Sequence, residues 1–275
     1  MSDLASVSWL HQQSSWLVAL ALAGGMLIVS RLGYVAGLCL QARSSDGGRG
    51  HFSGVQSSLL GLLALLLGFT LNMADQRFEA RRQLMLDDAV DLGALDLSAG
   101  FLAESRVAEF RQLLREYVAQ HANANHLNYQ RDSDEFRAEV AHAEDLHRRM
   151  TAIVRAEEQG KDAAPAPVVD LLVEQLGDAL AVHRRWITAM ETRVPPAIFA
   201  LLGCAALAAA GIVGFSGGLA RHRAIVQSVL LAVFVSGIFF VIHDLDTPDS
   251  GLAQSEREPL IHLSELLTHG PQKHP

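Results

Sequence analysis

Four long apolar stretches constrain this chain more than any other feature of its sequence. A hydrocarbon core about 30 Å thick needs about 20 apolar residues of helix to cross it. The stretches run from Trp16 to Ser30, and on to Leu40 past Arg31, from Phe52 to Ala74, from Val194 to Phe215, and from Ala224 to Ile242. The sequence therefore predicts an all-α, multi-pass membrane protein. Its four transmembrane helices form two pairs, and we interpret the first helix as a retained anchor.

The segment between the two pairs is polar enough to leave the bilayer but keeps helical periodicity, as at Val107, Phe110, Leu114 and Tyr117. We expect the second span to continue outward as a long helix, followed by two or more further helices. The predicted parts are a first transmembrane pair at 1–74, a soluble helical region at 75–193, a second transmembrane pair at 194–245 and a C-terminal segment at 246–275.

Prolines mark the start of two predicted helices. Pro195 and Pro196 fit the first turn of the third span, where a missing N–H costs nothing. Pro259 similarly opens a short amphipathic helix in the C-terminal segment. Three leucines fall on one side of it, which predicts that it lies at the membrane surface or docks on the bundle: Leu260, Leu263 and Leu267.

Charge and motif content exclude several classes of function. The formal net charge of −8 provides no concentrated basic face for nucleic acid. The sequence has no phosphate-cradling glycine loop, no H-E-x-x-H and no nucleophile elbow. The 12 histidines scatter, and the pairs His121 with His126 and His142 with His147 are spaced five apart, so neither pair shares a helix face. We therefore expect no enzyme activity, no cofactor and no metal site.

Basic residues near the span ends predict the orientation. Short loops between paired spans carry Arg31, Arg43, Arg49, Arg221 and Arg223, whereas none precedes the first span. The positive-inside rule then places the short loops in the cytoplasm and the helical region on the outer side of the inner membrane. A second basic group beside the helical region opposes this orientation: Arg77, Arg81, Arg82, Arg184, Arg185 and Arg193.

The second span carries one face of small and polar residues. At 100° per residue these fall within an arc of about 120°. They are Gly54, Ser57, Ser58, Gly61, Ala64, Leu65, Gly68, Asn72 and Asp75, with Glu79 continuing the row. Two interpretations stay open. Small residues let helices pack closely, with Asn72 bonding across helices, and an inward polar row can also line a water-filled path.

Two further groups lie near the membrane. Ala206, Ala210 and Gly214 in the third span recur every four residues, which predicts a helix-packing edge. At the end of the fourth span, Asp244, Asp246 and Asp249 form an acidic cluster close to the hydrocarbon. These acids could be hydrated at the interface, paired with Arg77, Arg81 or Arg82, or arranged as a Ca²⁺-type site.

Three segments carry a family resemblance. They are Gly61 to Arg82 (GLLALLLGFTLNMADQRFEARR) with Asp87, Asp88 and Ala89, then Leu113 to Val118 (LLREYV), and Asp244 to Gly251 (DLDTPDSG). Together they resemble the bestrophin-like domain family of bacterial membrane proteins. The resemblance implies a pentameric, mainly anion-conducting channel whose second span lines and narrows the pore, with the helical region in the cytosol.

This sequence departs from that pattern at the pore lining. The polar arc offers Leu65 as its bulky apolar residue, with Phe69 at the edge, and Asp75 and Glu79 are acidic. We therefore expect a homo-oligomeric ion channel embedded in the bilayer, with the second span around the path and a preference for cations. The alternative is a membrane-anchored interaction or sensory module without transport activity, in which the small-residue faces only hold the bundle together.

Overall fold

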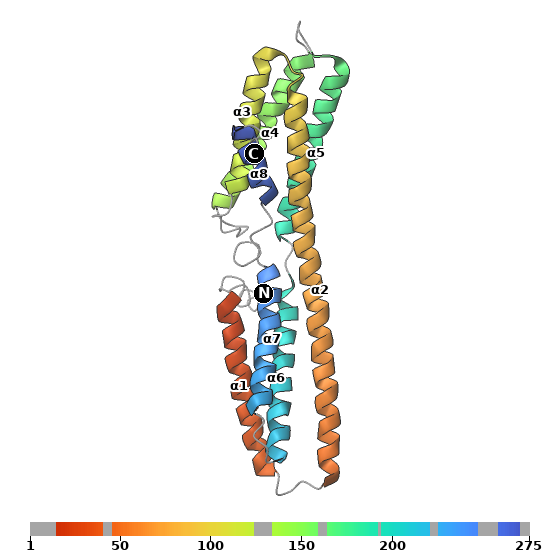
Figure 1. Cartoon of the computed structure of the whole chain (residues 1–275), viewed down its shortest axis with the longest axis vertical. Helices are drawn as coiled ribbons and strands as arrows, with labels where there is room; N and C mark the ends of the chain where they lie inside the picture. The colour runs from red at the N-terminus through yellow and green to blue at the C-terminus, as the bar shows by residue number, and fades with distance from the viewer. Residues whose placement is uncertain are drawn as a thin grey trace, which may run out of the picture. The chain divides into compact units, whose positions relative to one another are not determined.

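The computed structural model describes residues 15–40, 46–123, 134–158, 164–191, 194–220, 225–246 and 258–269, and every element in these ranges is a helix (Figure 1). The helices are α1 (Ser15–Leu40), α2 (Asp46–Ala99), α3 (Glu104–Asn123), α4 (Asp134–Glu158), α5 (Ala166–Glu191), α6 (Pro196–Leu219), α7 (Ile225–Asp246) and α8 (Glu258–His269). The all-α prediction is confirmed.

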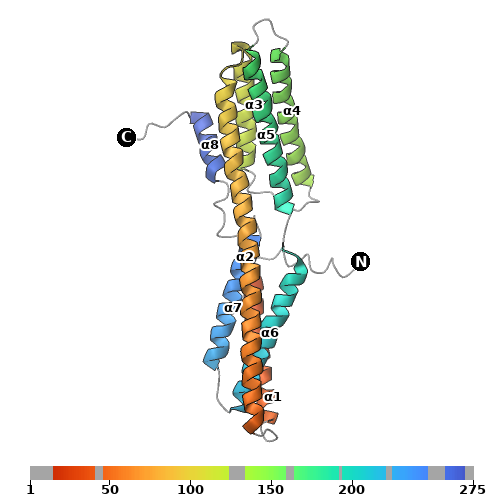
Figure 2. The same cartoon turned by 90° about the vertical axis from the view of Figure 1, so that its right-hand side faces the viewer.

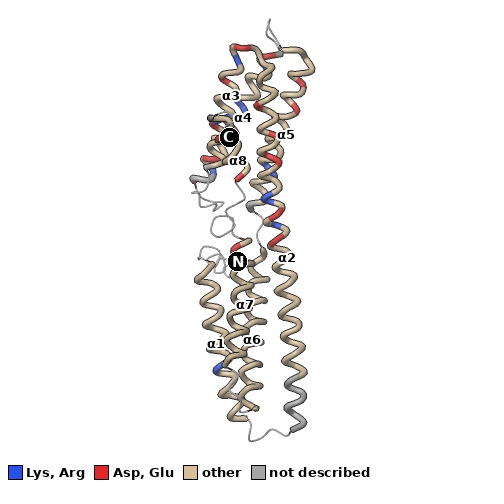
Figure 3. The backbone as a smooth tube through the Cα atoms, viewed as in Figure 1, with Lys and Arg blue, Asp and Glu red and all other residues tan. Residues whose placement is uncertain are grey.

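The chain divides into two compact units. Residues 1–78 and 193–252 form the first, here called the membrane unit, and residues 79–192 and 253–275 form the second, here called the helical unit. Four helices are long and apolar enough to cross a membrane: α1, α2 from Gly54 onward, α6 and α7. Charged residues concentrate in the helical unit (Figure 3). The single 54-residue helix α2 contributes to both units, as the sequence predicts.

The membrane unit is built around α1, which packs most extensively against α6 and also against α7. Its core includes Phe199 and Leu202 of α6, Phe239 of α7, and Leu63 and Leu67 of α2. Pro195 caps α6 and Pro196 occupies its first turn, which confirms the predicted helix start. Figure 2 shows the four helices of this unit running alongside one another.

The tightest contact in the membrane unit is a glycine seam between α1 and α6. A Cβ built on Gly33 would overlap the Gly211 carbonyl, and one built on Gly214 would overlap the Ser30 carbonyl. Gly37 and Gly218 stand equally close to backbone of the opposite helix. Ala206, Ala210 and Gly214 are all buried, so the predicted packing edge on the third span is confirmed.

The helical unit has a conventional apolar core. Phe110, Leu114 and Tyr117 of α3 are fully buried in it, as their helical spacing predicts. Leu260 of α8 is fully buried as well, with Leu263 and Leu267 packed beside it. Of the two positions expected for the C-terminal amphipathic helix, the structure therefore selects docking on the bundle.

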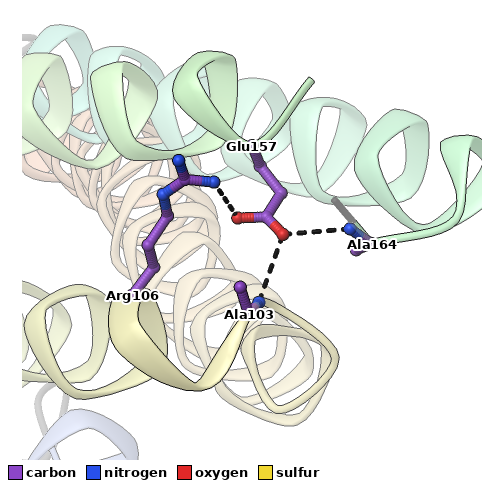
Figure 4. Close-up of polar contacts among 4 residues, drawn as sticks. All are labelled: Ala103, Arg106, Glu157 and Ala164. Atoms are coloured by element: carbon purple, nitrogen blue, oxygen red, sulfur yellow. Dashed lines mark hydrogen bonds and ion pairs between the residues drawn. The ribbon is translucent and has the colours of Figure 1, made fainter. Parts of the chain in front are cut away.

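A buried carboxylate ties three helices of this unit together (Figure 4). Glu157 near the end of α4 accepts hydrogen bonds from the backbone N–H groups of Ala103, at 3.2 Å, and Ala164, at 3.0 Å. Arg106 of α3 donates to the other carboxylate oxygen. Burial alone would raise the pKa of Glu157, but these donors outweigh it and hold that pKa below its ordinary value. The ionised carboxylate therefore fixes where α3 and α5 begin relative to α4.

Candidate functional site

The small and polar face of α2 is not covered by any other part of the described chain. All ten residues of the predicted row are exposed: Gly54, Ser57, Ser58, Gly61, Ala64, Leu65, Gly68, Asn72, Asp75 and Glu79. Nothing lies within 4 Å of the Cβ position on Gly54, Gly61 or Gly68. On the opposite side of the helix Leu63 and Thr70 are buried against the membrane unit. The chain thus packs one face of α2 and leaves the other open.

The open face of α2 differs in chemistry from the other exposed surfaces of the membrane unit. Most exposed positions on α1 and α7 are large and apolar, as lipid contact requires, and they include Trp16, Leu17, Leu20, Ile28, Leu32, Val226, Leu230, Val233 and Phe234. On α2, Asn72 and Asp75 have no hydrogen-bond or ion-pair partner within the described residues. An unpaired amide or carboxylate facing hydrocarbon costs several kcal/mol, roughly. Lipid is therefore a poor solvent for this face.

Bulky apolar side chains on this face are few. Leu65 is 54% exposed and Phe69 is 65% exposed, and they stand one helical turn apart on the open side of α2. Leu62, 52% exposed, and Met73, 37% exposed, lie beside Phe69. The large apolar side chains therefore gather along one edge of the small and polar face.

The acidic end of α7 is buried within the membrane unit. Asp244 is 6% exposed and Asp246 is 1% exposed. Asp246 Oδ1 accepts a hydrogen bond of 2.8 Å from the N–H of Val194, just before α6. The guanidinium of Arg77 on α2 lies 3.9 Å from the same oxygen. A buried carboxylate needs such partners because desolvation of its charge is costly.

Arg82, another of the charged candidates, pairs within its own helix. Arg82 lies 3.4 Å from Glu79 on α2 in an exposed pair, and such pairs contribute little to stability. Arg81 is 2% exposed. Asp249 lies outside the described residues. Within the described ranges no group of three or more potential ligands stands close enough to hold a metal ion.

A buried hydrogen bond connects α1 to α7 near Asp246. His243 Nδ1 lies 2.9 Å from Ser15 Oγ, and both residues are buried. The first residue of α1 is thereby held against the last turn of α7. The hydrogen bond of His243 thus joins the start of α1 to the end of α7.

Sequence reasoning missed a buried histidine cluster in the helical unit. His121 of α3 and His183 of α5 are joined by a ring-to-ring hydrogen bond of 2.8 Å. His147 of α4 stacks edge-on against Tyr117, whose ring also contacts the other two histidines. Spacing within single helices gives no hint of this cluster, because its members come from three helices. The one available signal is that His121 follows Tyr117 by four residues on the buried stripe of α3.

Burial favours the neutral form of two rings of this cluster, His147 and His183. Burial, followed by the charges of His147 and Arg184, lowers the pKa of His183 to about 4. Burial likewise lowers the pKa of His147. A histidine with a lowered folded pKa contributes stability that is complete above its unfolded value near 6.5 and is lost as pH falls toward the folded value. The cluster therefore makes the helical unit sensitive to acid.

Comparisons with known proteins agree with this architecture. A family model for the bestrophin-like domain matches residues 38–260. The crystal structure of a bacterial bestrophin homologue from Klebsiella pneumoniae has a TM-score of 0.65 at 15% identity, covering 91% of this chain and 98% of that one. A point mutant of a membrane protein has a TM-score of 0.67 at 16% identity, covering 90% of this chain and 98% of the other. Comparison with curated proteins found no match. At these identities, the structural likeness shows the fold alone.

Proposed function

The chain belongs to the bestrophin-like family, and we propose that this membrane protein is a homo-oligomeric ion channel in which copies of α2 surround the conducting path. The observation that carries the proposal is the open face of α2. It carries the polar side chains of Asn72 and Asp75, whereas most exposed residues of α1 and α7 are large and apolar. A face of this kind needs water or another protein chain, and a ring of copies provides both.

The part of α2 in the helical unit also favours assembly, through exposed apolar side chains. There the exposed residues include Val90, 69% exposed, and Leu97, 73% exposed, which lie two turns apart on one face of α2. Large apolar side chains on one face of a water-exposed helix are typical of a surface that another chain covers. The resemblance to bestrophins makes a pentamer the expected state.

The acids on the open face favour cations. Asp75 and Glu79 follow the span and recur once per subunit around a ring, so their potentials add at the mouth of the path. Glu79 is partly neutralised by Arg82, which leaves Asp75 as the principal unpaired charge. The proposed selectivity differs from the anion conduction that the family resemblance implies.

For the orientation, we propose the inner membrane with the short loops between α1 and α2 and between α6 and α7 on the cytoplasmic side. The arginines of those loops support this orientation through the positive-inside rule. The helical unit then lies outside, contrary to what the resemblance implies. Labelling of intact cells with a membrane-impermeant thiol reagent tests it in a background that lacks the native thiols, Cys39→Ala and Cys204→Ala. There an exposed helical-unit variant such as Arg148→Cys reacts only if that unit is outside.

A substituted-cysteine experiment tests the path itself. In a background with the exposed native thiols removed, Cys39→Ala and Cys204→Ala, a single cysteine is introduced at Leu65 of α2 or at Leu20 of α1. Both leucines are exposed on the single chain, at 54% and 64%, so they form a matched pair. The proteins are reconstituted in planar bilayers and treated with a charged methanethiosulfonate reagent.

The proposal predicts that the reagent reduces current through Leu65→Cys and leaves current through Leu20→Cys unchanged, because the first position faces water and the second faces lipid. Subunit number is measured on the same preparations by native mass spectrometry. A monomer, or equal insensitivity of both variants to the reagent, would exclude a path lined by α2. An oligomer that passes no current would favour the interaction or sensory module.

A further inference from the structure

A cavity of about 180 Å³ lies within the membrane unit, between α1, α6 and α7. It is lined by Leu27, Ser30, Arg31, Tyr34, Gly214, Ile225, Ser228 and Val229. These residues belong neither to the α2 face nor to the contact at Asp246. Ligand pockets that enclose a whole organic molecule usually measure about 300 Å³ or more. This cavity therefore suits one polar group of a larger molecule rather than an entire one.

Arg31 gives the cavity its charge. It is exposed on α1 and has neither a hydrogen bond nor an ion pair within the described residues. It lies roughly two and a half turns before the end of α1 at Leu40, which puts its backbone inside the hydrocarbon near one boundary. A cation at this depth is costly unless it reaches an anion or the headgroup layer.

Two hydroxyls complete the polar wall. Ser30 Oγ and Ser228 Oγ lie 2.7 Å apart, and this is the one hydrogen bond that either side chain makes within the described residues. In such a pair one hydroxyl donates and the other accepts, so the accepting oxygen keeps a hydrogen free for a further acceptor. Either serine can be the donor, and Ser30 is 5% exposed while Ser228 is half-buried. On either residue the free hydrogen therefore has few partners other than a group in the cavity.

The N-terminus of α7 adds partial positive charge to the cavity. Ile225 is the first residue of that 22-residue helix, and Ser228 and Val229 follow in its first turns. The first turn of a helix leaves N–H groups unpaired and carries a partial positive charge, which favours an anion. With Arg31 and the serine hydroxyls, three independent features of the cavity favour a negatively charged oxygen-rich group.

Apart from Tyr34 with its phenol hydroxyl, the remaining wall is apolar. Leu27 of α1 and Val229 of α7 line the cavity and are themselves 37% and 41% exposed on the outer surface of the unit. A ligand here meets donors at one end and lipid-exposed aliphatic groups at the other. That combination matches a phosphate ester that carries a hydrocarbon chain.

We propose that this cavity binds the phosphate group of an anionic membrane phospholipid. Arg31 pairs with the phosphate, the free serine hydroxyl donates to it, and Leu27 and Val229 contact the first part of an acyl chain. The site is independent of conduction, since it stands on the contacts of α1 with α6 and α7 and does not use the α2 face. It would hold a lipid whether or not the assembly forms a path for ions.

The test uses the full chain in detergent, stripped of lipid and examined by native mass spectrometry. The protein is incubated separately with short-chain phosphatidylglycerol, with the diacylglycerol of the same chain length and with inorganic phosphate. We expect one phosphatidylglycerol retained per chain. Diacylglycerol should not be retained, because it lacks the phosphate, and inorganic phosphate should neither bind nor displace the lipid, because it lacks the chain.

Variants assign the binding to this cavity. Arg31→Gln should lower phosphatidylglycerol retention about ten-fold, the scale of a lost charge-assisted hydrogen bond. Val229→Phe, which fills the cavity from an exposed position, should lower it comparably and decides the matter if Arg31→Gln does not fold. Arg148→Gln, on the surface of the helical unit, is the matched control and should retain lipid as the unaltered protein does.

Three results would overturn the proposal. Unchanged retention in both Arg31→Gln and Val229→Phe would place any bound lipid elsewhere. Equal retention of diacylglycerol would show that the phosphate is not recognised. Displacement of the lipid by equimolar inorganic phosphate would identify a soluble anion as the ligand instead.

Discussion

Two rows of small residues in the membrane unit have opposite surroundings. Along the seam between α1 and α6, a methyl group added to Gly33 or Gly214 would overlap the backbone of the opposite helix. Along α2, the same addition to Gly61 or Gly68 would meet open space. Glycine costs a helix roughly 1 kcal/mol relative to alanine, so a row of glycines needs a compensating contact. The first row has its contact inside the chain, whereas the second does not.

The α1–α6 seam belongs to the folding of one chain, because both of its sides are encoded in that chain. For the α2 face we propose that copies of the chain complete it, because no helix of the same chain covers its polar residues and lipid is a poor neighbour for them. Substitutions in the two rows should therefore act on different steps.

The largest expected effect is on the seam. Gly214→Leu should prevent folding, because the new side chain overlaps the Ser30 backbone and helix backbones cannot yield as side chains do. The cost should be roughly 3 kcal/mol or more. Fluorescence-detected size-exclusion chromatography in detergent measures the yield of folded protein. Gly61→Leu is the control and should give a normal yield of folded protein. An equal loss of folded protein in both variants would contradict the proposed difference between the α1–α6 seam and the α2 face.

The helical unit differs from the α1–α6 seam, because a buried carboxylate stabilises it instead of close contact between helix backbones. Glu157→Gln should lower the free energy of unfolding by about 2 kcal/mol at neutral pH, since Arg106 and two backbone donors lose an ionised acceptor. The folded pKa of Glu157 is lowered, so its contribution is present above the ordinary value of 4.5 and is lost as pH falls through the folded value.

Thermal unfolding followed by circular dichroism at neutral and acidic pH checks this expectation. The difference between Glu157→Gln and the unaltered protein should shrink on acidification. Glu144→Gln, an exposed position on the same helix, serves as the control and should change little at either pH. A deficit that is independent of pH would point to altered packing instead of lost charge.

On the α2 face, the next effect concerns assembly. Gly68→Leu should lower the ratio of oligomer to monomer about ten-fold by holding neighbouring helices apart. Gly237→Leu on α7 is a matched control, because that glycine is also exposed in a span with nothing within 4 Å of its Cβ position. Native mass spectrometry gives the ratio. If Gly237→Leu dissociates the oligomer as strongly, α2 is not the specific interface.

A smaller effect should follow at Asn72. Asn72→Leu should reduce assembly or conductance several-fold, because the amide is exposed on the open face and has no partner in its own chain. Thr70→Val is the comparison two residues away, where the hydroxyl donates to Leu66 O within the same helix and the side chain is buried. Planar-bilayer recording and subunit counting apply to both variants. Similar, negligible changes would indicate that Asn72 faces neither a partner nor water.

The smallest expected change is in ion preference. The unaltered protein should be cation-selective, and Asp75→Asn together with Glu79→Gln should weaken that preference by about two-fold through the loss of a ring of negative potential. Reversal potentials in asymmetric salt measure the ratio. An anion-selective current that ignores both substitutions would contradict the proposed placement of this face toward the path.

Features that depend on length and periodicity could be predicted from the sequence. The four spans follow from hydrocarbon thickness, the start of α6 from Pro195 and Pro196, and the docking side of α8 from the spacing of Leu260, Leu263 and Leu267. Each is a property of a single helix, so the residues along that helix are enough to decide it. The family resemblance likewise rests on contiguous motifs, and the match over residues 38–260 confirms it.

Features that depend on neighbours could not be predicted in this way. His121 and His183 are hydrogen-bonded although they are 62 positions apart in the sequence and lie on different helices. No spacing within one helix predicts this pair. Asp246 had several arginines as plausible partners, and the structure brings it to Arg77 and to the N–H of Val194. Charge alone does not choose among such partners, because the choice depends on which helix ends meet.

The two small-residue rows show the division most clearly. The sequence by itself determined that α2 and α6 each carry a small face, because helical periodicity places those residues on one side. Only the tertiary structure decided that α1 fills the face on α6 while the face on α2 stays open. Whether a small face is filled depends on how closely another backbone approaches, and that distance is set by the packing of whole helices.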